Sequence, residues 1–262
     1  MLLYRQRGLG KLSPNNTRNL QWRITEEYRL RILGWDIEAS SLVADFGIIF
    51  CVGFKEVGRG KAEVFSLLDY DEEDVIKAER LLLKDVSKRL LDSDVWLTHF
   101  GTYFDIPFVN TRLLYHRLPV IPANYAHIDT WKISRNRLKL QNNRLVSIQN
   151  FLGTAEEKNA IKPLMWVRAL GGHKPSMRYI VEHCRKDVVV LEEAYNRLRP
   201  LVLDHPNKGL IDGRGGCSIC GESKLQKRGF HVTRTRKYQR FQCMGCGGWS
   251  KGTKPLEIAS RA

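Results

Sequence analysis

The sequence predicts an α/β protein in which helices flank a mixed β-sheet, followed by a small metal-binding module. Apolar segments with the lengths and spacings of strands and helices follow one another as three strands, a helix, a strand and then helices. This order is typical of a mixed sheet with helices on its faces. The stretch Ile32–Ile37 is apolar on both faces apart from Asp36, as in a central strand of a covered sheet. Two Cys-x-x-Cys pairs near the C-terminus supply the module.

The charge balance is unusually basic for a globular protein. The 262 residues carry a formal net charge of +15 and the pI is near 9.7, which predicts a polyanionic partner, most simply nucleic acid. An anionic membrane surface is the alternative. Against it, the longest apolar run, Phe46–Phe54, is too short to cross a bilayer, and no segment has the pattern of a basic amphipathic helix. We therefore expect no membrane partner.

The N-terminus and the cysteines bear on localisation. The chain begins without a charged-then-apolar secretion pattern. Four of the six cysteines fall in Cys-x-x-Cys pairs, which indicates metal binding in a reducing compartment rather than disulfides. We expect a cytoplasmic, nucleoid-associated protein, or one in the host cytoplasm if a phage encodes it.

The expected elements follow a polar, basic arm over residues 1–27, which would contact phosphate or form a plain tail. Strands are expected near 28–37, 46–54 and 62–68 as an antiparallel meander, with another at 95–99. The acidic run Asp71–Asp74 predicts a helix start. Later elements are a helix carrying Phe108, Leu113 and Leu114, a last strand within 126–131, a helix ending at Gly153, and a long helix from Pro175 to about Arg199.

Acidic side chains recur beside these elements. Asp36 and Glu38 stand two residues apart on the first strand, so both face the same side. Two acids on one buried face are costly unless a cation lies between them, although a lone Asp-x-Glu is more often a strand end reaching solvent. On the long helix, His183 and Asp187 are four residues apart and therefore stacked, beside a buried stripe that includes Cys184 and Val188.

Three motifs in this order resemble those of the DEDD superfamily of 3′–5′ exonucleases, which have the ribonuclease H-like fold. The motifs are Trp35-Asp36-Ile37-Glu38, Phe104-Asp105-Ile106-Pro107-Phe108 and His183-Cys184-Arg185-Lys186-Asp187, and the match covers residues 28–200. The chain is most similar to predicted exonucleases of bacteria, archaea and phages with the Gly-x-x-Phe-Asp-x-Pro-Phe form, found here over Gly101–Phe108.

The resemblance implies catalytic residues Asp36, Glu38, Asp105, His183 and Asp187. It also implies two Mg²⁺ or Mn²⁺ ions held by the four carboxylates, for which hard oxygen ligands are suited. Asp36, Glu38 and Asp187 would share the metal load, Asp105 would hold the more exposed ion, and His183 would align the attacking water. Carboxylates crowded in a poorly solvated cleft should hold protons at unusually high pH without metal.

Two positions depart from the superfamily's pattern. An Asn commonly stands five residues before the second-motif aspartate, where this chain has Phe100 beside His99. In the third motif the chain has a histidine at the spacing of the tyrosine branch, so water alignment and general-base catalysis both stay open for His183. Asp129 is expected to serve as an N-cap or structural hydrogen-bond acceptor rather than a metal ligand, and Cys51 and Cys184 as core residues.

The C-terminal module follows a Gly-rich linker, residues 204–216, and spans 217–262, so that the ribonuclease H-like domain is expected over 28–203. Cys217, Cys220, Cys243 and Cys246 have the spacing of a closed tetrahedral site for one structural Zn²⁺ and resemble a zinc ribbon. Residues 205–262 hold twelve Lys or Arg and three Asp or Glu, more than half of the net charge. The residues expected to bind nucleic acid are Lys227, Arg228, Arg234, Arg236, Lys237, Tyr238 and Arg240.

The leading interpretation is a metal-dependent 3′–5′ exonuclease acting on single-stranded or frayed 3′ ends, with DNA favoured over RNA. A structure-specific endonuclease on the same fold is one alternative. A non-catalytic nucleic-acid-binding adaptor with a degenerate nuclease core is another. The aromatic residues of the ribbon would pack its small core or stack on bases. His231 is expected to be a surface residue. The alternative partner for the ribbon is a protein, such as a polymerase or another replication or repair protein.

Overall fold

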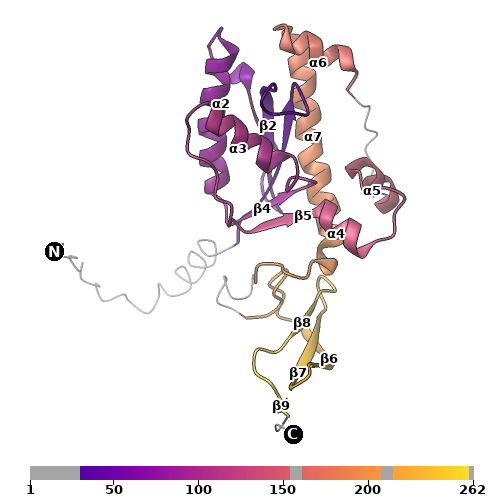
Figure 1. Ribbon diagram of the computed structural model, residues 1–262. Coiled ribbons are helices and arrows are strands. Elements are labelled where there is room, and N and C mark those ends of the chain that lie inside the picture. The colour runs from indigo at the N-terminus through magenta and orange to yellow at the C-terminus, as the bar shows by residue number, and fades with distance from the viewer. Residues whose placement is uncertain (1–29, 154–160, 208–214, 260–262) are drawn as a thin grey trace, which may run out of the picture.

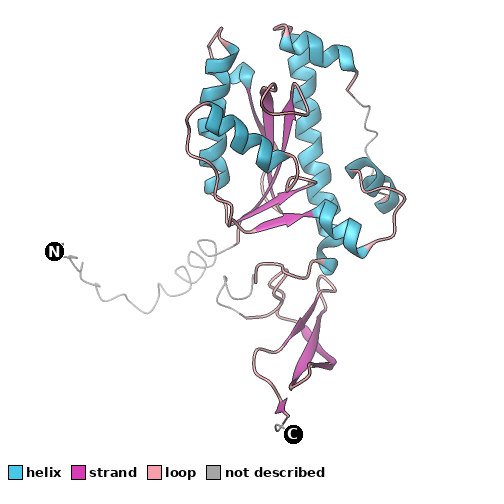
Figure 2. Cartoon of the chain, viewed as in Figure 1, coloured by secondary structure: helices cyan, strands magenta, loops and turns pink. Residues whose placement is uncertain are grey.

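A computed structural model describes residues 30–153, 161–207 and 215–259. Its larger part is a five-stranded sheet in the order β3-β2-β1-β4-β5, with helices on both faces (Figures 1 and 2). β1, β2 and β3 are antiparallel neighbours, whereas β4 and β5 run parallel to β1. The strands are β1 (Ile32–Ala39), β2 (Ile49–Glu56), β3 (Glu63–Ser66), β4 (Val95–Thr98) and β5 (His127–Asp129). The expected meander and mixed sheet are thus confirmed, with β1 at the centre.

Helices cover the sheet in two groups. α2 and α3 lie on one side of it and α7 runs along the other (Figure 1). The α-helices are α2 (Val75–Leu91), α3 (Asp105–Tyr115), α4 (Thr130–Arg137), α5 (Leu145–Leu152), α6 (Pro163–Leu170) and α7 (Lys174–Leu198). Short 3₁₀ turns η2 (Leu67–Asp69) and η3 (Arg199–Leu201) follow β3 and α7. Within the described residues, no helix is both long and apolar enough to cross a membrane.

Alternate side chains of β1 point to opposite faces of the sheet, and so toward the two helix layers. Trp35 and Ile37 point into the main core, where Leu82, Leu83 and Val86 of α2 are fully buried. Gly34, Asp36 and Glu38 take the opposite face, toward α7. A Cβ on Gly34 would lie 3.8 Å from a methyl group of Leu191, and one on Gly53 of β2 would lie 2.9 Å from Cys184 Sγ. The absence of a side chain at these glycines lets α7 approach the strand backbone.

Several sequence expectations on element boundaries were wrong. β2 begins at Ile49 rather than Phe46, because residues 40–48 form a loop in which Phe46 is 83% exposed. α2 begins at Val75, and the acid before it caps the helix, since the Asp74 side chain accepts hydrogen bonds from the Ile76 and Lys77 N–H groups. Helix α6 was not expected at all, and Leu114 of α3 is exposed. The left-handed Gly153 does end α5, as predicted.

Buried charge connects α2 and α3 to the start of β2. Glu79 is fully buried and receives Arg112 through Nε and Nη2, the shorter contact being 2.6 Å, while His116 Nε2 lies 2.7 Å from its Oε2. The Ile49 N–H also donates to Glu79 Oε1, and Arg112 Nη1 donates to the Ala44 carbonyl. Such a buried carboxylate is tolerated because its hydrogen-bonding capacity is met.

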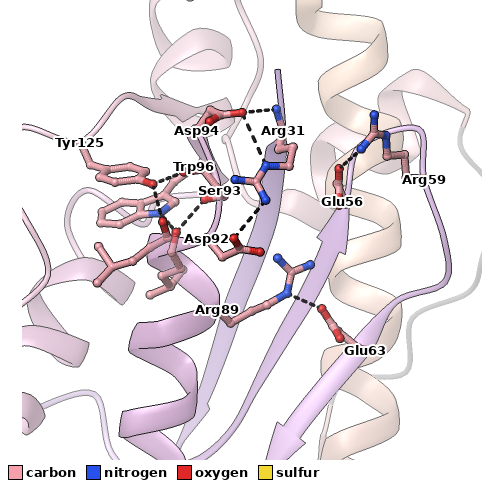
Figure 3. Close-up of polar contacts among 12 residues, drawn as sticks. Arg31, Glu56, Arg59, Glu63, Arg89, Asp92, Ser93, Asp94, Trp96 and Tyr125 are labelled. Carbon is pink, nitrogen blue, oxygen red and sulfur yellow. Dashed lines mark hydrogen bonds and ion pairs between the residues drawn. The ribbon is translucent and has the colours of Figure 1, made fainter. Parts of the chain in front are cut away.

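The N-terminal end of β1 is held by more exposed contacts (Figure 3). The Arg31 side chain reaches Asp92 Oδ1 at 3.1 Å, and its backbone N–H donates to Asp94 Oδ2 at 2.7 Å. In the same region Trp96 Nε1 donates to the Leu90 carbonyl. Each exposed pair contributes little on its own, but together they fix the turn between α2 and β4 beside the start of β1.

Beyond α7 the chain forms a second, four-stranded sheet. Its strands are β6 (Leu225–Val232), β7 (Arg236–Cys243), β8 (Trp249–Lys251) and β9 (Glu257–Ile258), with β7 paired to all three others. The segment that leaves α7 is anchored first, because His205 is buried and its Nε2 lies 2.7 Å from the hydroxyl of Tyr195 on α7. The expected N-terminal arm, 1–27, and part of the expected linker lie outside the described residues.

The close approach of α7 gives a stability prediction. Gly53→Ala would place a Cβ 2.9 Å from Cys184 Sγ and 3.0 Å from the Cys184 carbonyl oxygen, so the helix backbone must shift. We expect the free energy of unfolding to fall by about 1–3 kcal/mol, the usual cost of overpacking, in urea denaturation. Gly171→Ala is the control, because the nearest atoms to its Cβ are 3.5 and 3.6 Å away. Equal stability of the two variants would contradict this packing.

Candidate functional site

Acidic side chains from the first strand, α3 and α7 converge at one end of the sheet. Asp36 and Glu38 are both half-buried on the face of β1 that α7 covers. On α7, the His183 Nδ1 atom lies 3.3 Å from Glu38 Oε1 and 3.4 Å from Asp187 Oδ2. The stacking of His183 over Asp187 expected from their spacing is therefore present, and it brings both side chains to the acid of β1.

Three of these side chains are close enough to share one ion. Glu38, His183 and Asp187 each offer a ligand atom, and the three atoms lie within 4.8 Å of one another. Asp36 is not in this tight group among the residues described, although it lies on the same strand face two residues earlier. Carboxylate oxygens are the ligands that Mg²⁺ and Mn²⁺ prefer, so the donor set fits a divalent cation.

Asp105 joins the site from the first residue of α3. Its side chain is 2% exposed, and its Oδ1 accepts the N–H of Ile37 at 3.1 Å, midway between Asp36 and Glu38. That N–H is accessible because the pairing of β1 with β4 stops at Gly34. Burial, together with the charges of Asp129 and Glu38, raises the pKa of Asp105 to about 7. The expected retention of protons in the metal-free cleft holds for this acid.

The pKa of His183 shifts upward as well. Hydrogen bonds to Asp187 and Glu38 favour the imidazolium, and they raise its pKa to about 9 against the opposing effect of burial. The protonated ring places positive charge between two carboxylates.

Asp129 has the structural role that the sequence favoured. It is buried and caps α4, accepting the Trp131 N–H at 3.0 Å. The same carboxylate accepts the N–H groups of Phe100 at 2.9 Å and Thr102 at 3.1 Å, and so holds the turn that leads into Asp105. Cys51 and Cys184 are fully buried core residues, as predicted.

Sequence reasoning missed the surroundings of this turn. The motif marks Phe100 only as a departure from Asn, yet its ring clusters with those of Tyr103 and Trp131, at centroid distances of 5.0 to 5.6 Å. The residue spacing gave no signal of this cluster, because Trp131 is brought to the other two by the parallel pairing of β4 and β5.

The four C-terminal cysteines also come together. Cys217 Sγ lies 3.6 Å from Cys246 Sγ, and Cys220 Sγ lies 3.5 Å from Cys243 Sγ. Four thiolates each about 2.3 Å from a tetrahedral zinc ion would be roughly 3.8 Å apart, so the spacing fits Zn²⁺. Each knuckle closes with a glycine at positive φ, Gly221 at 77° and Gly247 at 72°. His231 is exposed, as expected for a residue outside the ligand set.

Hydrogen bonding favours thiolate character within this cluster. The Gly245 and Cys246 N–H groups donate to Cys243 Sγ at 3.3 and 3.5 Å. Burial acts to raise the pKa of Cys243, but these N–H groups and the neighbouring thiols outweigh it, so that the pKa is lowered.

The basic residues expected to bind nucleic acid lie on β6, β7 and the turn between them. Those with exposed side chains are Lys227, Arg228, Arg234, Arg236 and Arg240, whereas Lys237 is half-buried. Tyr238 requires a correction: it is 9% exposed with the Lys251 ammonium 5.0 Å from its ring, so it packs inside the module and offers no free face for stacking. Phe230 and Trp249 are exposed rings of the module, with the Lys237 ammonium 4.5 Å from the Phe230 centroid and the Arg240 guanidinium 4.7 Å from the Trp249 centroid.

The raised pKa of His183 predicts how the stability of metal-free protein depends on pH. Because the folded-state pKa, about 9, exceeds the ordinary 6.5, the stabilisation is full below pH 6.5 and is lost as pH rises through 9. We expect the free energy of unfolding to fall by about 1–2 kcal/mol over this range, since partial solvation screens the ion pairs. His183→Gln should lack this decrease in urea denaturation, and the exposed His231→Gln should retain it. The same slope in both variants would contradict the assignment.

Comparison with known proteins identifies the superfamily. No curated protein sequence matches the chain. Among solved structures, the chain is similar to the family B DNA polymerase from the hyperthermophilic archaeon Pyrobaculum calidifontis, with 15% identity, a TM-score of 0.48, and coverage of 79% of this chain and 31% of the polymerase chain. The chain thus spans about a third of that polymerase. A family model described as the RNase H superfamily matches residues 34–199, the segment from β1 to the end of α7, and the chain therefore belongs to the RNase H superfamily.

Proposed function

We propose that the chain is a metal-dependent 3′–5′ exonuclease that hydrolyses phosphodiester bonds at the 3′ end of nucleic acid, with DNA favoured. The observation that carries this proposal is the convergence of Glu38, Asp105 and Asp187 from three separate elements, with His183 between two of them. Membership in a superfamily of nucleases that usually use divalent metals supports it. The raised pKa of the buried Asp105 beside other carboxylates is typical of a functional site.

The acids and His183 would have different roles in catalysis. Asp36, Glu38, Asp105 and Asp187 would hold two Mg²⁺ or Mn²⁺ ions, which when bound activate water and neutralise charge on the phosphate and the departing 3′ oxygen. The main-chain N–H of Ile37 fixes the orientation of Asp105. His183 would orient the attacking water from α7, because its ring lies beside Glu38 and Asp187.

The C-terminal module would bind one structural zinc ion and grip the substrate. Four converging thiols and exposed basic residues on the neighbouring strands support this assignment. The small core around Cys217, Ile219 and Cys243 is too little to fold such a segment without metal. Phosphate contacts from the arginines would then retain a polyanionic strand near the nuclease domain.

Substitution of the acids tests the catalytic assignment. Asp36→Asn and Asp187→Asn should each lower metal-dependent cleavage by roughly a hundredfold or more, because even indirect supports of metal ligands are worth 10–100-fold. The measurement is digestion of a 5′-labelled single strand with Mn²⁺, which in the wild type should give a ladder of successively shorter products.

The exposed Glu73→Gln variant is the matched control and should cleave normally. Full activity of either folded Asp variant would contradict the assignment. A few discrete internal cuts in the wild type would indicate an endonuclease, and binding without cleavage would indicate an adaptor.

Removal of zinc tests the module. Cys220→Ser should lose the bound zinc ion, unfold residues 215–259 and weaken nucleic-acid binding, while the nuclease domain stays folded. Zinc content by a colorimetric assay and limited proteolysis are the measurements, because an unfolded module should be cleaved selectively. Ser218→Ala, within the same knuckle, is the control. A Cys220→Ser module that resists protease as the wild type does would refute a metal-dependent fold.

A further inference from the structure

A strip of basic residues crosses the nuclease domain outside the candidate catalytic site. This basic strip, residues 135–144, runs from the end of α4 to the start of α5 and reads Arg-Asn-Arg-Leu-Lys-Leu-Gln-Asn-Asn-Arg. The wider segment 130–153 contains five Lys or Arg and no Asp or Glu. The strip has four cations with exposed side chains: Arg135, Arg137, Lys139 and Arg144.

The opposite layer of the domain carries the opposite charge. Residues 30–129, which form the sheet together with α2 and α3, contain eleven Lys or Arg and sixteen Asp or Glu. α4 and α5 pack against α7, whereas α2 and α3 lie on the other side of the sheet (Figure 1). A polyanion that approaches the domain is therefore repelled by the layer of α2 and α3 and attracted to the basic strip.

Packing turns the cations of the strip outward. Leu138 and Leu140 are partly buried against the cluster formed by Ile148, Ala194 and Leu198, which joins α5 to α7. The backbone is extended at Leu138, so successive side chains alternate in direction. Because the two leucines point inward, the basic side chains on either side of them face solvent. The strip is thus presented on the packed surface of α5 and α7.

The strip ends at the edge of the sheet where the acids lie. His99 follows β4, and its Nε2 atom lies 2.9 Å from the Asn143 carbonyl oxygen, while its Nδ1 atom lies 2.9 Å from Thr130 Oγ1. β4 and β5 run parallel to β1, so their carboxyl ends meet at the edge where β1 delivers Glu38. Asp105 comes six residues after His99. A nucleic acid bound along the strip can therefore continue to the acids.

The side chains of the strip favour contacts with a nucleic-acid backbone over contacts with bases. Besides its cations, the strip holds four amide side chains and no aromatic ring. Cations and amides bind phosphate and sugar oxygens, whereas proteins commonly hold single strands by stacking bases on aromatic rings. A basic surface without rings therefore suits a duplex, whose bases are already stacked and whose phosphates lie on the outside.

We propose that the basic strip binds the phosphate backbone of a duplex that lies next to the candidate catalytic site. The inference rests on the proposed nuclease function and adds a double-stranded segment to its substrate. The duplex would lie on the strip while an unpaired 3′ tail reaches the acids. The chain would then bind a tailed duplex more tightly than the same tail alone.

The test measures binding of a DNA duplex with a 3′ tail, and of the tail alone, by fluorescence anisotropy without added Mg²⁺ or Mn²⁺. The variant of the full chain combines Arg137→Gln, Lys139→Gln and Arg144→Gln. It should bind the tailed duplex about tenfold or more weakly, because phosphate contacts are lost, while its affinity for the tail changes by less than about twofold. The slope of log Kd against log salt concentration should become shallower by about 2–3 for the tailed duplex, since each phosphate contact contributes about 0.9.

The matched control removes the same charge from three exposed lysines of α2, by Lys77→Gln, Lys84→Gln and Lys88→Gln. It should bind both DNAs as the wild type does. A second readout is acetylation of Lys139 in the wild type, followed by mass spectrometry. The tailed duplex should protect this lysine, and the tail alone should not.

Unchanged binding of the tailed duplex by the strip variant would overturn the proposal and leave an acidic protein surface as the partner of the strip. An equal loss of affinity for the tail alone would also overturn it, as would an equal loss in the α2 control. Selective loss for the tailed duplex, in a chain whose wild type cleaves neither DNA, would reject the nuclease function and leave the duplex-binding strip standing.

Discussion

The close contact between α7 and the two central antiparallel strands is the constraint on which the candidate site depends. Gly34 and Gly53 leave no side chain between the layers, and Cys184 of α7 donates its thiol toward the Asp36 carbonyl at 3.7 Å. One residue before that cysteine and three after it come His183 and Asp187. A helix held further from the sheet would leave these side chains short of Glu38, since each carboxylate reaches only a few ångströms from its backbone.

Two buried acids have opposite electrostatic surroundings. On the α2 side, Glu79 has its charge met by Arg112 and His116 and by a backbone N–H group. Near the C-terminal end of β1, Asp105 of α3 receives main-chain N–H donors but lies near two other carboxylates, and its pKa rises to about 7. The first arrangement is complete within the protein and serves the packing of α2 and α3. The second is left with excess negative charge, which a bound cation would relieve.

Much of the fold could be predicted from the sequence because its signals are local. The apolar run around Trp35 marked the central strand, and the helical spacing of Cys184, Val188, Leu191 and Tyr195 marked the buried face of α7. Phe46 misled the prediction, since a hydrophobic residue in a loop has the same appearance in sequence as the start of a strand. Helix α6 was missed because it is short and its apolar residues are largely exposed or half-buried.

The site was only partly predictable, because its contacts join residues that are far apart in the sequence. The acids could be named from motif spacing, but the hydrogen bond that aims Asp105 at Ile37 depends on where the pairing of β1 with β4 stops. Likewise, the three N–H groups on Asp129 come from two loops that are adjacent only in the folded sheet. The role of Tyr238 depended on burial within a very small module, where a ring can be either core or surface.

The hydrogen bond between Tyr195 and His205 limits the distance that can separate the C-terminal module from the end of α7. It anchors the chain to α7 near residue 207, and the next described residue is 215. Eight residue steps span at most about 28 Å when fully extended. Under the proposed function, this short tether would raise the effective concentration near the acids of any strand that the module holds. Weak binding by each part would then suffice for the two parts together to retain one strand.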